Sequence, residues 1–174
     1  MDLTEILSTG WRSFFDALRP DHRQRLVEFL REEYVDEARD VAQFQEHARR
    51  MIYPHFRERL LRIAEEEKAH VEWLREKIVA LGGEIPEVPI AVEKGRNAWE
   101  NLLIDIEEEK RDGIEALERL YTLAQDADPE IAEGLRRIHE EEKRHRGEIL
   151  DMLMRTDPHA FSTTTPSEVF ERKK

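Results

Sequence analysis

Cysteine is absent from this chain of 174 residues. The sequence therefore excludes disulfides, zinc–thiolate sites, cysteine-ligated iron–sulfur clusters and cysteine nucleophiles. Long apolar runs are also missing, and none approaches the ~20 residues that a membrane-spanning helix needs. The first five residues lack the basic start and apolar segment of a secretory signal, so a cytoplasmic location is expected.

Glycine and proline are scarce, with seven of each, whereas charged and apolar residues each make up 39% of the chain. This balance is typical of amphipathic helices, and the length is enough for one domain with a sizeable core. The formal net charge is −12. An acidic surface argues against nucleic acid or a membrane as a partner and favours the attraction of cations.

Apolar residues recur at three- and four-residue steps along most of the chain, which predicts four long amphipathic helices. Proline suits the first turn of a helix, glycine commonly follows its end, and Asn or Asp caps its start. The predicted boundaries are a start at Asp21, a start at Pro54, a stop at Gly82–Gly83, an N-cap at Asn97 and an N-cap at Asp128.

The connections between these helices predict the topology. The first two helices, and the last two, are joined by short turns and should form antiparallel hairpins. The link between the hairpins has about fifteen residues and can reach ~50 Å, the length of a bundle. The fold class is therefore all-α, a four-helix bundle over 21–155 with one long crossover. A short amphipathic helix in residues 1–20 precedes it, and a poorly ordered tail, 156–174, follows it.

Each apolar stripe is interrupted by an acidic residue at a corresponding place. Two of the interruptions are Glu-x-x-His pairs, whose members share one helix face because they lie three residues apart. That spacing alone is weak, since roughly one such pair is expected by chance in this composition. Its position on the apolar face makes it informative. The interrupting residues are Glu37, Glu67 with His70, Glu109, and Glu142 with His145.

Folding the chain as two hairpins brings these six side chains to about one level of the core. Four carboxylates at one depth would repel each other and lose their hydration without cations. Two divalent metal ions would neutralise them, with the imidazoles completing the coordination. Carboxylate and imidazole ligands without thiolate suit iron or manganese, and zinc could compete.

With these motifs the sequence resembles the ferritin-like di-iron carboxylate family, in its rubrerythrin and bacterioferritin branches. Residues 37–49 are similar to the first-helix signature of that family, 66–70 to the second and 142–145 to the fourth, whereas the third helix matches only at Glu109. The likeness covers roughly 22–154. It implies a ferritin-like bundle with two iron ions. By the same resemblance, Glu67 and Glu142 bridge the ions, Glu37 and Glu109 are terminal ligands, and His70 and His145 bind one ion each.

The sequence also departs from this pattern. Rubrerythrins usually carry a rubredoxin domain with four cysteines, and this chain has none. Their extra third-helix carboxylate has only Asp112 as a counterpart, and the first-helix tyrosine seven residues after the ligand Glu is Phe44. Whether Asp112 or Glu33 adds a seventh ligand stays open.

The remaining acids and histidines carry no such pattern and are expected at the surface. Glu66 and Glu141 have an alternative role, in which either holds a ligand histidine from outside the site. The residues expected at the surface are Glu65, Glu66, Glu140, Glu141, His22, His47, His55, His139 and His159.

The leading functional hypothesis is a di-iron oxidoreductase that oxidises Fe(II) with dioxygen or hydrogen peroxide, of ferroxidase or peroxidase type, supplied by an unidentified electron donor. Two alternatives stay open. One is binding or storage of iron or manganese without turnover, and the other is a structural or cargo protein. A homo-oligomer, dimeric or larger, is expected.

Overall fold

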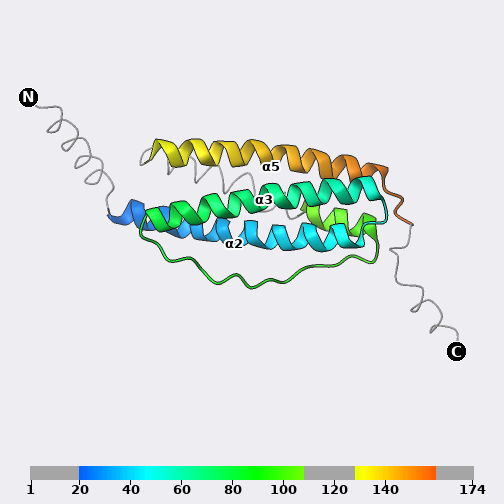
Figure 1. The fold of residues 1–174 in the computed structure, drawn as a ribbon, viewed down its shortest axis with the longest axis horizontal. Helices are drawn as coiled ribbons and strands as arrows, with labels where there is room; N and C mark the ends of the chain where they lie inside the picture. The colour runs from blue at the N-terminus through cyan, green and yellow to red at the C-terminus, as the bar shows by residue number, and fades with distance from the viewer. Residues whose placement is uncertain (1–19, 108–127, 160–174) are drawn as a thin grey trace, which may run out of the picture.

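The structure is a computed structural model that describes residues 20–107 and 128–159. These residues form three long helices, α2 (Pro20–Arg50), α3 (Pro54–Ala80) and α5 (Pro129–Arg155), and a helical segment over 98–107. No strand occurs in the described residues. The predicted all-α bundle is confirmed (Figure 1). None of the described helices is both long enough and apolar enough to cross a membrane. The predicted N-terminal helix and most of the predicted tail lie outside the described ranges.

The helix ends follow the predicted boundary residues closely. The Asp128 carboxylate accepts hydrogen bonds from the backbone N–H groups of Glu130 and Ile131 at the start of α5. The Asn97 side chain likewise accepts from the backbone of Glu100, at 2.9 Å. Gly82, at φ 73°, ends α3 in the left-handed region that glycine tolerates. The start of α2 is one residue earlier than predicted, because Pro20 is already helical.

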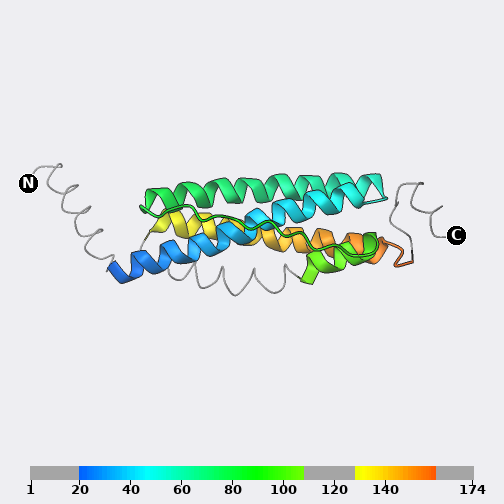
Figure 2. The ribbon, with the colours of Figure 1, turned by 90° about the horizontal axis from the view of Figure 1, so that it is seen from below.

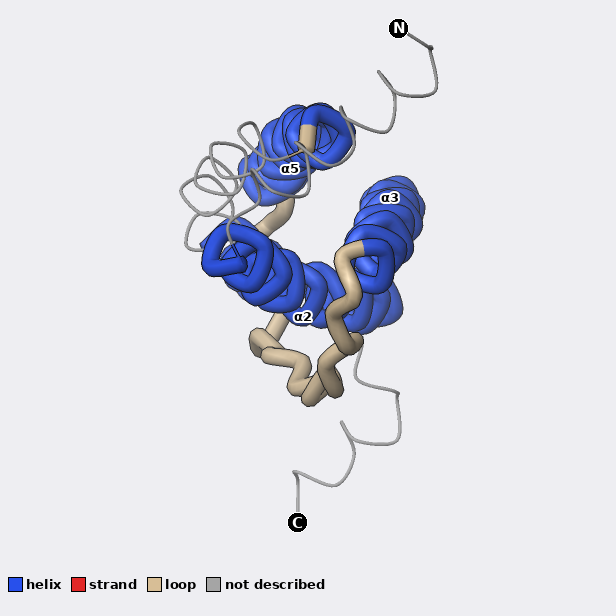
Figure 3. The backbone as a smooth tube through the Cα atoms, turned by 90° about the vertical axis from the view of Figure 1, so that its left-hand side faces the viewer, coloured by secondary structure: helices blue, strands red, loops and turns tan. Residues whose placement is uncertain are grey.

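The link between the hairpins is extended, as predicted. Residues 83–95 have no regular secondary structure and run from one end of the bundle to the other (Figures 1 and 2). Seen end-on, this crossover lies outside α2, away from α5 (Figure 3). Helices α2 and α3 form the first hairpin, and α3 packs against α5.

The hydrophobic core has two separate parts, one toward each end of the bundle. In α2, for example, Leu30 belongs to one part and Phe44 to the other. The residues between them include the predicted interruptions of the apolar stripes. The first part contains Phe44, Ala48, Met51, Phe56, Leu60, Ile63, Ala64, Ala98, Leu102, Ile106, Ile149 and Met152. The second contains Leu26, Leu30, Leu74, Ile78, Ile131, Ala132, Leu135 and Ile138.

Two glycines of α5 should respond oppositely to replacement by alanine. A Cβ on Gly134 would lie 1.9 Å from the indole of Trp73, whereas a Cβ on Gly147 would meet nothing within 4 Å. We expect Gly134→Ala to destabilise the fold by about 1–3 kcal/mol through overpacking. Gly147→Ala should stabilise it by up to about 1 kcal/mol, because alanine favours the helix. Urea unfolding of both variants measures the difference, and a loss of stability in Gly147→Ala would contradict the packing described.

Candidate metal centre

Five of the six predicted site residues meet between the two parts of the core. Glu37 comes from α2, Glu67 and His70 from α3, and Glu142 and His145 from α5. All are buried except Glu142, whose side chain is 14% exposed. The sixth, Glu109, lies outside the described residues. The polar residues that interrupt the apolar stripes of α2, α3 and α5 therefore lie close together in the bundle.

Glu67 occupies the centre of this cluster, between the two imidazoles. Its Oε2 atom is 2.9 Å from Nδ1 of His70, and its Oε1 atom is 2.6 Å from Nδ1 of His145. The ring centroids of the two histidines are 6.1 Å apart. One carboxylate thus faces both imidazoles, each with a different oxygen.

The other two carboxylates approach the same histidines. Oε1 of Glu142 lies 3.3 Å from Nδ1 of His70 and 3.7 Å from Nδ1 of His145, so it also faces both rings. Glu37 is 3.3 Å from Nδ1 of His70. One ligand atom each of Glu37, Glu67, His70 and Glu142 lies within 4.8 Å of the others, a spacing that could accommodate a metal ion.

Burial and mutual repulsion shift the ionisation of these groups. Burial raises the pKa of Glu37 well above its usual value, and the charges of Glu67 and Glu142 raise it further. Burial and the charge of Glu67 raise the pKa of Glu142 as well. Burial acts in the same sense on Glu67, but close contacts with both histidines outweigh it and lower the pKa of that carboxyl. The pKa values of these carboxylates are therefore shifted in opposite directions, as expected for several acids that share one desolvated space.

The two imidazoles compensate part of this negative charge. Burial favours the neutral ring, but hydrogen bonds with Glu142, Glu37 and Glu67 raise the pKa of His70 above its usual value. Contacts with Glu67 raise the pKa of His145 against the same effect of burial. These contacts therefore favour the protonated, charged form of both rings in the metal-free protein, and a cation at Nδ1 would compete with that proton.

The outer nitrogen of each histidine is bound by a glutamate from the facing helix. Nε2 of His70 lies 2.7 Å from Glu141 of α5, and Nε2 of His145 lies 2.6 Å from Glu66 of α3. Both glutamates were expected on the solvated face, with the histidine-holding role as the alternative, and the structure favours the alternative. Such bonds fix the ring orientation so that Nδ1 points at the cluster.

The donor set fits a metal ion better than it fits pairing within the protein. Oε1 of Glu67 and Oε1 of Glu142 lie 2.6 Å and 3.7 Å from Nδ1 of His145, yet none of these three buried atoms has a partner with hydrogen-bond geometry among the described residues. Buried polar atoms are normally hydrogen-bonded. Atoms that converge without hydrogen-bond geometry are what a coordinated cation requires, and carboxylate with imidazole suits iron or manganese.

The remaining residues considered in the sequence lie outside the group of four ligand atoms or outside the described residues. Glu33 is half-buried and does not belong to the group of four ligand atoms, and Asp112 lies outside the described residues. His55 and His159 are exposed, as predicted, whereas His22 and His139 are half-buried. The surface position expected for His47 is wrong, because this side chain is fully buried.

His47 belongs to a second buried polar cluster, which the apolar periodicity of the sequence does not predict. Its Nδ1 lies 2.6 Å from Oδ1 of Asp105, and its Nε2 lies 2.9 Å from the backbone oxygen of Glu93. The Gln43 side chain pairs with both backbone groups of Glu93, and Asn101 accepts from the backbone N–H of Gly95. This cluster attaches the end of the crossover to α2 and to segment 98–107. The one available signal was the i, i+4 spacing of Gln43 with His47 and of Asn101 with Asp105.

Loss of Asp105 should destabilise the chain strongly. Burial raises the pKa of Asp105 despite the opposing contact with His47, and both side chains are fully buried. Asp105→Ala removes the carboxylate that faces the buried Nδ1 of His47, at an expected cost of about 3 kcal/mol in the free energy of unfolding. Glu46→Ala is the comparison, because Glu46 pairs with the exposed Arg49 and Lys94 and should cost less than about 1 kcal/mol. Equal losses of unfolding free energy in Asp105→Ala and Glu46→Ala, measured by urea unfolding, would refute the larger contribution expected of the buried Asp105–His47 pair.

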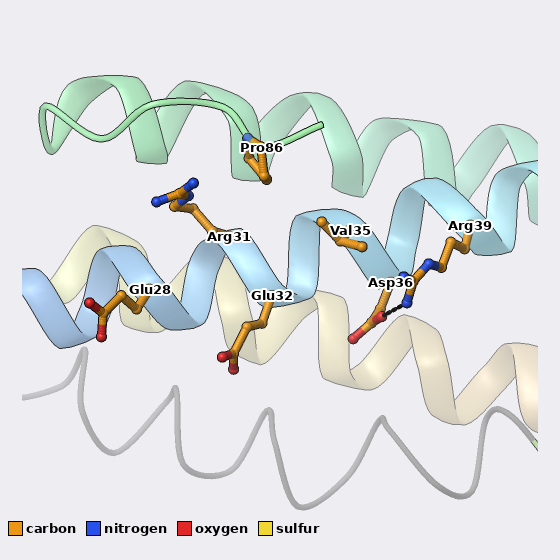
Figure 4. A pocket seen from close by; sticks show the side chains of 7 residues that line it. All are labelled: Glu28, Arg31, Glu32, Val35, Asp36, Arg39 and Pro86. Atoms are coloured by element: carbon orange, nitrogen blue, oxygen red, sulfur yellow. Dashed lines mark hydrogen bonds and ion pairs between the residues drawn. The ribbon is translucent and has the colours of Figure 1, made fainter. Parts of the chain in front are cut away.

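A groove on the outside of α2 is separate from the candidate centre. Its lining side chains come from α2 and from Pro86 of the crossover, and Asp36 pairs with Arg39 at its edge (Figure 4). None of the six candidate ligands takes part. The lining residues are Glu28, Arg31, Glu32, Val35, Asp36, Arg39 and Pro86.

The fold and the cluster define a ferritin-like di-iron carboxylate protein, a class that implies an iron-binding site. A family model described as Rubrerythrin matches residues 28–154. The chain belongs to the rubrerythrin family. No curated protein sequence matches it.

Several solved structures share the fold. The Desulfovibrio desulfuricans bacterioferritin superposes with a TM-score of 0.69 and 24% identity, over 77% of this chain and 81% of that one. A ferritin-like, diiron-carboxylate protein from Bacillus anthracis gives a TM-score of 0.66 and 23% identity, over 76% and 97%. The Mycobacterium tuberculosis bacterioferritin BfrA gives 0.66 and 18%, over 75% and 84%. At these identities the likeness concerns the fold.

Proposed function

We propose that this chain is a di-iron oxidoreductase that oxidises Fe(II) with dioxygen or hydrogen peroxide. The observation that carries the proposal is the convergence of three buried ligand atoms without a hydrogen bond, from Glu67, Glu142 and His145, at a level where the apolar core is interrupted. Two adjacent iron ions, when bound there, supply two electrons to an oxidant without an organic cofactor.

The roles of the chain's own residues follow from the contacts. Glu67 and Glu142 face both imidazoles, which suits carboxylates shared between two metal ions. Glu37 faces only His70 among the two histidines, which suits a terminal position. Glu109, the other terminal ligand that the family resemblance implies, lies outside the described residues. The apolar residues on either side, Ile63 and Leu74 in α3 for example, limit the access of water to the cluster.

Rapid oxidation of added iron tests the proposal. The metal-free chain is loaded anaerobically with two equivalents of Fe(II) and mixed with dioxygen or with peroxide. Formation of Fe(III), followed by its near-ultraviolet absorbance, and consumption of the oxidant should exceed the rate in buffer for at least one oxidant. Iron that binds without faster oxidation would refute turnover and indicate a binding or storage role. The ratio of oxidant consumed to Fe(II) oxidised is measured for dioxygen and for peroxide separately. The oxidant that the protein uses is the one consumed in a fixed ratio to iron.

A further inference from the structure

The two Glu-x-x-His segments are identical at five of six positions. Residues 65–70 read EEEKAH and residues 140–145 read EEEKRH, so the difference is Ala69 in α3 against Arg144 in α5. Both positions precede the histidine by one residue. The contacts made by Arg144 show that this single difference reaches the candidate centre.

Arg144 neutralises the glutamate that binds His145. Its Nη2 lies 2.7 Å from Oε2 of Glu66, and the same oxygen is 2.6 Å from Nε2 of His145. On the other side, Oε2 of Glu141 lies 2.7 Å from Nε2 of His70, and no Lys or Arg of the described ranges forms a direct ion pair with Glu141, whose charge acts on Arg144 only at longer range. The two glutamates are otherwise alike, with side chains 31% and 30% exposed.

A carboxylate that accepts a hydrogen bond from the outer nitrogen of an imidazole increases the donor strength of the inner nitrogen. A guanidinium on the same oxygen withdraws part of that charge and adds a positive charge beside the site. Nδ1 of His70 is therefore the stronger donor, and among the described residues a cation lies beside the glutamate of His145 but not beside that of His70. The two halves of the centre differ although their inner residues are nearly symmetric.

We propose that the Ala69/Arg144 difference sets the order of metal loading, so that the half containing Glu37 and His70 binds a divalent ion first and more tightly than the half containing His145. This inference rests on the proposed two-metal site, and not on its oxidation chemistry. Glu141, Glu66 and Arg144 act as positioning residues, since they reach the metal positions through the histidines.

Stepwise binding of Co(II) to the metal-free full-length chain tests the order, with calorimetry for the two constants and visible absorption for the coordination. Glu141→Gln should weaken the first step by about 10-fold or more, and Glu66→Gln should weaken the second. Arg144→Ala should tighten the second step and bring the two constants closer. Ala69→Arg, at an exposed position, should weaken the first step by placing a cation near Glu141.

The double exchange Ala69→Arg/Arg144→Ala is the sharpest variant, because it keeps the composition and should reverse the order. After the exchange, Glu66→Gln should affect the first step and Glu141→Gln the second. Lys143→Ala is the matched control: it removes the same charge from the same segment, but Lys143 pairs with Glu140, which binds neither histidine. Its constants should stay within about twofold of the parent, as for an exposed charge.

Three results would overturn the inference: unchanged constants in both Arg144→Ala and Ala69→Arg, an equal effect of Lys143→Ala, or no uptake of two ions. Circular dichroism of each variant shows whether it is still folded, so that a change in metal binding is not mistaken for unfolding. The proposed oxidation can fail independently. Variants that shift Co(II) binding as expected in a chain that does not accelerate Fe(II) oxidation would refute the function and leave the loading order intact.

Discussion

Replacement of Glu67 by alanine should remove most of the metal affinity of this chain and slow Fe(II) oxidation by more than about 100-fold, beyond the range for residues outside the coordination sphere. The reason is geometric. Glu67 places one oxygen near each imidazole, so one substitution removes a ligand from both metal positions. Metal content after gel filtration and the initial oxidation rate measure the effect.

Two further variants make this result interpretable. Glu67→Gln keeps the side-chain volume and should lose the affinity as well, which separates lost charge from a new cavity. Glu65→Ala removes a mostly exposed carboxylate two residues earlier in the same helix and should change neither metal content nor rate. Retention of two metal ions by the double variant Glu67→Ala/Glu142→Ala would show that the cluster is not the binding site.

Metal binding should stabilise the fold more at high pH than at low pH. Glu37 and Glu142 have raised pKa values, so their contribution to stability is present below the usual value of 4.5 and is lost as pH rises through the raised values. The contributions of His70 and His145, whose pKa values are also raised, are lost in the same direction from 6.5 upward. Glu67 acts oppositely, since its lowered pKa costs stability only as pH falls below 4.5.

The metal-free chain should therefore lose thermal stability as pH rises above about 4.5, and further above about 6.5, while metal affinity rises because the ion competes with protons. At a free Mn(II) concentration 1,000 times the dissociation constant, one site stabilises the fold by about 4 kcal/mol. This corresponds to an increase in Tm of roughly 8–16 °C. Thermal unfolding with Mn(II) or with a chelator at pH 5.5, 7 and 8.5 measures it. A shift that is independent of pH, or one that persists in Glu67→Ala, would contradict this account.

The positions of the candidate ligands could be predicted because helix periodicity is a local property of the sequence. Glu37, Glu67 and Glu142 interrupt apolar stripes, and a side chain's place on a helix face follows from its spacing to its neighbours. The crossover followed from chain length between Gly83 and Asn97. His47 was misplaced for the same reason, because it lies beside the stripe and its burial depends on the crossover and on Asp105, which are distant in sequence.

The sequence by itself determined that the helices now seen as α2, α3 and α5 would carry acids and histidines at one depth of an apolar core, since the repeat of an α-helix converts spacing into direction. Only the tertiary structure decided which helix binds which histidine from outside. Glu66 and Glu141 each reach the facing helix, so a short hydrogen bond joins residues more than 70 positions apart. Arg144 breaks the symmetry of the two motifs for the same reason: its partner is fixed by the packing of α5 on α3, which no local pattern encodes.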